Sequence, residues 1–152
     1  MRWDWLKKID DTLWYFELPK GSTKNNQVRP VILNSIAKSI VESLVGNNPE
    51  YVFSYEGQKL GRLNKSAYRK ARVRAGKVIP NILKTNVHSL RHSFGERLTE
   101  SDVPCDWKQA LLGHNPKEVT WRYSQYYQGK VNLLKLLEFV ERLVRYSCLD
   151  EA

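Results

Sequence analysis

The sequence predicts an α+β domain, mainly α, in which a small N-terminal antiparallel β-sheet packs on a helical bundle. Two observations favour this class. Aromatic and β-branched residues gather in the first 33 positions, which is typical of strands. From position 34 onward, apolar residues recur at helical spacing between capping residues and glycines.

Residues 13–18 are rich in aromatic side chains and residues 28–33 in β-branched ones, so both ranges are predicted strands. Turn-forming residues fill positions 19–26 between them and predict a β-hairpin with a basic tip. A short third strand is predicted at residues 51–54.

Helical segments are predicted over most of the remaining chain. Asn34 or Ser35 can cap the first, which ends at Gly46. Its apolar face is predicted to hold Ile36, Ile40, Val41 and Leu44. The others are predicted at residues 66–75, 89–98, 106–112, 116–125 and 131–147. The last has a wide apolar stripe, which predicts that it docks on another surface.

Size, charge and cysteine content narrow the class of protein. The 152 residues suit a single domain over residues 1–152. No apolar run approaches the roughly 18 residues that span a bilayer, and no signal-peptide stretch is present, so we expect a cytoplasmic protein without a membrane partner. Two cysteines cannot form a disulfide framework. The net charge of +9 favours a polyanionic partner, nucleic acid before membrane surface.

Three short strings carry residues that could do chemistry. His88 and Arg91 are three positions apart, so a helix would place them on one face. The string Leu-Leu-Gly-His ends at His114, and Tyr123 follows nine residues later. Each string is weak evidence alone, but their order and spacing together are specific.

With Trp3 to Leu6, Thr23 to Asn25 and Arg29 to Leu33, these strings resemble the catalytic domain of the tyrosine recombinases, the phage integrase family. The resemblance covers about residues 1–127. It implies the tyrosine recombinase catalytic-domain fold and site-specific recombination of double-stranded DNA, in phage or mobile-element integration. No cofactor, metal or small-molecule substrate is implied, and the sequence contains no Gly-x-x-x-x-Gly-Lys phosphate loop. The implied location is a bacterial cytoplasm, at the nucleoid.

The resemblance also implies a role for each site residue. Tyr123 would attack a DNA phosphodiester, form a 3′-phosphotyrosyl link and free a 5′-hydroxyl. Arg91 would grip the non-bridging oxygens, and His88 would assist proton transfer at the nucleophile. His114 would hydrogen-bond the scissile phosphate, and Lys24 would donate a proton to the leaving 5′-oxygen. Contacts that position the DNA are expected from the basic segment with Arg69, Lys70, Arg72 and Arg74.

Several alternatives stay open at this point. Lys20 competes with Lys24, and Tyr126 and Tyr127 compete with Tyr123. We interpret His92 as a buried structural histidine; its i,i+4 spacing from His88 could bind a metal, but no motif completes the ligand set. The rival functions are a DNA-binding module without catalysis, a helical domain with accidental motif matches, and a type IB topoisomerase, which His88 argues against.

The sequence departs from the family pattern at its start. The family has a further arginine, which by this alignment would fall ahead of Met1. In an alternative alignment Arg2 is that arginine, but position 5 is then Trp where the family has Glu. The chain is therefore expected to lack the extreme N-terminal part of the domain and the upstream DNA-binding domain, and to have little activity alone. By resemblance, the last helix would dock into a neighbour in a DNA-bound homotetramer; the alternative is that it folds back on its own core.

Overall fold

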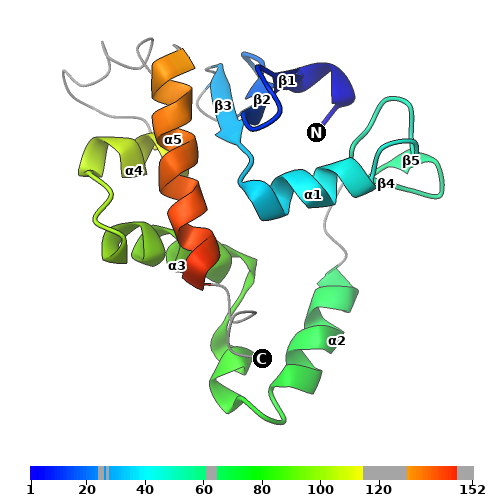
Figure 1. Cartoon of the computed structure of the whole chain (residues 1–152). Helices are drawn as coiled ribbons and strands as arrows, with labels where there is room; N and C mark the ends of the chain where they lie inside the picture. The colour runs from blue at the N-terminus through cyan, green and yellow to red at the C-terminus, as the bar shows by residue number, and fades with distance from the viewer. Residues whose placement is uncertain (24–25, 27, 61–64, 115–129, 147–152) are drawn as a thin grey trace.

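The computed structural model describes residues 1–152 except 24–25, 27, 61–64, 115–129 and 147–152 (Figure 1). Its elements are the helices α1 to α5, short 3₁₀ turns and two small antiparallel sheets. The α+β, mainly helical class predicted from the sequence is therefore confirmed. Among the residues described, no helix is long and apolar enough to cross a membrane.

A three-stranded sheet forms the N-terminal part, in the order β1 (Leu6–Lys8), β2 (Trp14–Leu18), β3 (Arg29–Ile32). All neighbours pair antiparallel, with Phe16 opposite Leu6 on one side and Val31 on the other. Pro30 has no backbone N–H, and it is tolerated in β3 because an edge strand pairs with a neighbour on one side only. The β2–β3 hairpin is confirmed, and the 3₁₀ turn η1 (Trp3–Trp5) precedes β1.

The short strand predicted at residues 51–54 is wrong in its bounds, because the strand found here begins only at Ser54. Tyr51 makes an isolated bridge to Arg2, and β4 (Ser54–Tyr55) pairs with β5 (Gln58–Lys59) as a separate hairpin. The reason is the turn at Glu56 and Gly57, both with positive φ, which reverses the chain after two strand residues.

Helix α1 (Ser35–Ser43) follows β3 and starts at Asn34, whose side chain accepts a hydrogen bond from the backbone N–H of Ala37 at 2.9 Å. Its buried stripe contains Ala37, Val41 and Leu44, at helical spacing. Ile36 and Ile40 are exposed instead, so the predicted apolar face is wrong by about one residue. The buried stripe packs on Trp14 and Phe16 of the sheet.

A second core joins the C-terminal helices. Here α3 (Val87–Glu100), α4 (Cys105–Leu112) and α5 (Lys130–Arg142) meet, and η4 (Leu143–Tyr146) extends α5. Leu98, Val103, Phe139 and Leu143 are its buried members. The α5 helix also contacts β3, so it links the two cores (Figure 1).

The last helix is largely covered by its own chain. Five apolar side chains of α5 and η4 are buried: Leu133, Leu136, Phe139, Val140 and Leu143. In this single chain the segment packs on its own core through these side chains. Docking of the last helix into a neighbour on DNA stays a prediction.

Helix α2 (Lys65–Ala75) stands away from the sheet in Figure 1 and packs against η2 (Pro80–Lys84). It ends at Gly76 as predicted. The helix predicted at residues 116–125 lies outside the described residues.

Candidate active site

The N-terminal end of α3 presents His88 and Arg91. Asn86 caps this helix: its side chain accepts hydrogen bonds from the backbone N–H groups of His88 at 2.8 Å and Ser89 at 3.2 Å. Ser89 Oγ accepts in return from the N–H of Asn86 at 3.1 Å, which completes a capping box. The cap at Asn86 starts the helix at Val87, one residue before His88, so the predicted start at residue 89 was late. His88 therefore lies in the first turn, and Arg91 follows on the same side of the helix.

The C-terminal end of α4 presents His114. Gly113 adopts the left-handed conformation, with φ 66°, and its N–H donates to the carbonyls of Ala110 and Gln109. The N–H of His114 donates to the carbonyl of Gln109 at 3.0 Å. This glycine-dependent cap turns the chain sharply after Leu112 and fixes where His114 begins.

These two helix ends face one cleft of about 1050 Å³, which His88, Arg91 and His114 all line. The cleft also contains Lys108 of α4 and Glu96 of α3. The lining of the cleft thus contains two cationic side chains and three histidines against one carboxylate. Arg91 makes no ion pair with any residue in the described ranges, so its guanidinium is available to an anion.

Arg29 approaches the same place from the sheet. Its Nη2 donates to the carbonyl of Leu111 at 2.7 Å, across to the last turn of α4. Burial, and next the positive charge of Arg91, lower the pKa of the Arg29 guanidinium below its ordinary value. The two guanidiniums are therefore near enough to repel each other, although Arg29 itself is not among the residues that line the cleft. Sequence reasoning missed Arg29 as a site residue; the available signal was a cation inside a β-branched strand.

Comparison with known proteins now places the chain. Residues 1–129 match the model of the phage integrase family. This chain belongs to the phage integrase family. Transposase B from transposon PsiTn554 of Staphylococcus aureus is 33% identical over 84 residues, which are 55% of this chain and 13% of that protein. The chain thus aligns with a small part of that relative, and no solved structure matches it significantly.

The integrase-family match includes the positions of all five predicted catalytic residues. The structure brings three of them, His88, Arg91 and His114, to one cleft. Lys24 and Tyr123 lie outside the described residues, as do the competing Tyr126 and Tyr127. The roles of all five residues stay predictions.

The interpretation of His92 as buried is wrong. His92 is exposed, lines the cleft, and packs edge to face against His88 with ring centroids 4.7 Å apart. The i,i+4 spacing places both rings on one side of α3, which is why His92 follows His88 rather than the core. In the described part of this integrase-family chain, no group of three His, Cys, Asp or Glu side chains could hold a metal ion.

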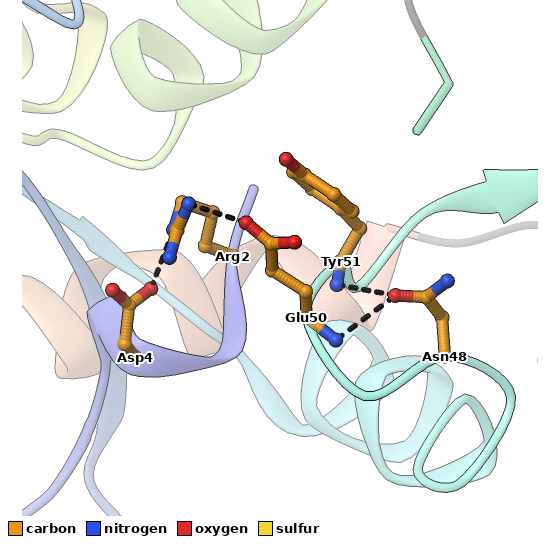
Figure 2. A network of polar contacts seen from close by, with 5 residues as sticks. All are labelled: Arg2, Asp4, Asn48, Glu50 and Tyr51. Carbon is orange, nitrogen blue, oxygen red and sulfur yellow. Dashed lines mark hydrogen bonds and ion pairs between the residues drawn. The ribbon is translucent and has the colours of Figure 1, made fainter. Parts of the chain in front are cut away.

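Arg2 lies among acidic partners near the start of the chain. Figure 2 shows its guanidinium between two carboxylates: Nε donates to Asp4 at 3.0 Å and Nη1 to Glu50 at 2.6 Å. The hydrogen bond with Asp4, ahead of the other charges, raises the pKa of Arg2. Asn48 holds the Glu50 loop by accepting the backbone N–H groups of Glu50 and Tyr51 (Figure 2). Arg2 therefore secures the N-terminus and does not line the cleft.

The basic residues predicted to contact DNA divide into two groups. Arg69, Lys70 and Arg74 are exposed on α2. Arg72 is half-buried, and its Nη1 donates to the carbonyl of Thr85. Arg72 therefore ties α2 to the residue that follows η2. Contact of the four basic residues with DNA stays a prediction.

Proposed function

We propose that this chain cleaves and rejoins double-stranded DNA at a specific recombination site through a 3′-phosphotyrosyl intermediate on Tyr123, with little activity on its own. One observation carries the proposal: His88, Arg91 and His114 meet in a cation-rich cleft in which Arg91 has no carboxylate partner among the residues described. A phosphodiester supplies the missing negative charge, and phosphoryl transfer increases that charge on the non-bridging oxygens.

The proposed step balances without a cofactor. The phenolic oxygen of Tyr123 attacks phosphorus, the new O–P bond forms, and the bond from phosphorus to the 5′-oxygen breaks. His88 assists removal of the phenolic proton, which a group with a pKa near 10 does not lose readily at neutral pH. Lys24 protonates the leaving 5′-oxygen. Attack by another 5′-hydroxyl on the phosphotyrosine reverses these events and rejoins the DNA.

Arg91 and His114 stabilise the phosphate during both halves of this reaction. Arginine provides a planar fork of donors that stays charged, and the histidine adds a directed hydrogen bond. The exposed Arg69, Lys70 and Arg74 of α2 would hold the DNA backbone outside the cleft. The biological role proposed is integration of a phage or mobile element, with four copies of the parent protein assembled on DNA.

A covalent-capture experiment tests this function without knowledge of the recombination site. The chain is incubated with nicked duplexes of randomised sequence, labelled on the strand that would remain attached to protein. The nick lets the product diffuse away after cleavage, so a slow reaction still accumulates the covalent complex. We expect a labelled band on a denaturing gel from the wild type and from Tyr126→Phe, and none from Tyr123→Phe.

The alternative outcomes are distinct. A band that persists with Tyr123→Phe would refute the proposed nucleophile. Absence of any band, with DNA binding that weakens steeply as salt increases, would indicate a DNA-binding module without catalysis.

A further inference from the structure

Arg29 joins the sheet to the end of α4. It begins β3 opposite Leu18, and its side chain reaches the carbonyl of Leu111, 82 positions along the chain, at 2.7 Å. The last carbonyls of a helix lack partners within the helix, and a cation at this end also faces the negative end of the helix dipole. The contact is thus favourable for α4 and fixes its end against β3.

The guanidinium of Arg29 also packs on the turn that leads to His114. A Cβ built on Gly113 would lie 1.8 Å from Arg29 Nη1 and 2.2 Å from its Cζ. The guanidinium therefore fills the space in which other residues carry a side chain. Position 113 therefore requires glycine for two reasons: the left-handed backbone conformation and the close approach of the Arg29 side chain.

Arg29 is half-buried, and a half-buried arginine beside another cation is costly unless it does something that a neutral residue cannot. Arg29 Nε is buried without a hydrogen-bond partner among the described residues, and Arg91 is near enough to disfavour its charge. An apolar side chain would fill the same space without desolvating a charge. A specific geometric role at the cleft accounts for an arginine here.

We propose that Arg29 is a positioning residue of the cleft, which holds the Gly113–His114 turn against β3 and so sets where His114 stands relative to Arg91. This inference rests on the proposed function, because His114 is the group proposed to bind the scissile phosphate. Arg29 acts through Leu111 and Gly113 and does not touch the phosphate itself.

Two variants and one control test the inference in the full chain. Arg29→Met keeps the aliphatic length and removes every donor, whereas Arg29→Lys keeps the charge without the planar fork. Arg2→Met is the matched control, because Arg2 is bonded to exposed carboxylates away from the cleft. Thermal melting first establishes a temperature at which all four proteins are folded.

The first readout does not depend on activity. The chain has three histidines, so its imidazole proton–carbon NMR spectrum has three signals to assign. We expect Arg29→Met to shift and broaden the His114 signal while that of His88 stays in place. An unchanged His114 signal in a folded Arg29→Met protein would overturn the inference, whether or not the wild type cleaves DNA. Should Arg29→Met not fold, Arg29→Lys is expected to shift the His114 signal, and an unchanged signal there overturns the inference.

The second readout separates positioning from direct phosphate contact. We expect Arg29→Met to slow formation of the covalent complex by about 10- to 100-fold, because small misplacements of a reacting group have effects of this size. DNA affinity, measured with Tyr123→Phe present, should change by less than about threefold, and Arg29→Lys should recover only part of the rate. Loss of affinity as large as the loss of rate would show that Arg29 touches the phosphate and would contradict a positioning role.

Absence of covalent complex from the wild type defeats the proposed function, and the NMR readout still decides the role of Arg29.

Discussion

The guanidinium of Arg29 occupies the space that a side chain at position 113 would need, because a Cβ on Gly113 would stand 1.8 Å from Arg29 Nη1. This contact joins the β2–β3 hairpin, on which Lys24 is predicted, to the turn that carries His114. A strand residue and a helix cap, distant in sequence, thus pack against each other beside the cleft.

The first prediction concerns Gly113→Ala. The left-handed backbone costs about 1–2 kcal/mol for a residue with a Cβ, and displacement of the Arg29 side chain adds about 1–3 kcal/mol. Gly46→Ala is the matched control, because Gly46 has φ 89° but nothing within 4 Å of its Cβ position. Urea denaturation should show a larger loss of unfolding free energy at position 113. Equal losses at both positions would mean that Arg29 does not hold this turn.

The second prediction concerns α5. Leu136 is 2% exposed and Leu134 is 39% exposed on the same helix. Leu136→Ala should therefore lower the free energy of unfolding by about 2–5 kcal/mol, whereas Leu134→Ala should change it by about 0.5 kcal/mol. The wild-type denaturation midpoint should not depend on protein concentration, since this helix packs within its own chain. A midpoint that rises with concentration would indicate packing between copies instead.

The third prediction concerns the cap of α3. Asn86→Ala removes the side-chain oxygen that accepts hydrogen bonds from two backbone N–H groups, and it should lower the free energy of unfolding by about 1 kcal/mol. Asn81→Ala, whose side chain makes no hydrogen bond among the described residues, should cost far less. Since the cap fixes the first turn that carries His88, Asn86→Ala should also increase amide hydrogen exchange at the start of α3. The same loss from both asparagines would refute the capping role.

The fourth prediction concerns acid stability. Hydrogen bonds from Lys135 and then Arg142 lower the pKa of Glu138 in the folded chain. A lowered native pKa stabilises the fold above the unfolded glutamate pKa of about 4.3, and this contribution is lost as pH falls through the native value. Between about pH 5 and pH 3, the urea midpoint should fall less in Glu138→Gln than in the wild type. Identical pH profiles would show that these contacts do not persist in solution.

Local signals predicted most elements well. The β2–β3 hairpin, α2 up to Gly76 and α4 up to Gly113 follow from residue types that act within a few positions. The buried face of α1 did not, because Ile36 and Val41 look alike in the sequence and only the position of Trp14 decides which one is covered. The 3₁₀ ending of α5 likewise depends on tertiary packing.

The candidate site was predicted from the spacing of short strings and from the family resemblance that they carry, and spacing alone has limits. Spacing placed His88 and Arg91 on one side of a helix, and the resemblance joined them to His114, which lines the same cleft. Spacing assigned His92 to the core, although i,i+4 geometry sets it beside His88. It could not find Arg29, because the partners Leu111 and Gly113 lie more than 80 positions away and meet it only in the folded chain.

The proposed chemistry stands or falls on which residue becomes bonded to DNA. The covalent complex from the nicked-duplex reaction would be digested with nuclease and trypsin, and the nucleotide-bearing peptide sequenced by mass spectrometry. We expect a 3′-nucleotide on Tyr123, with Tyr126 and Tyr127 unmodified. A nucleotide on either of those tyrosines, or a complex that forms equally well with Arg91→Met, would contradict it.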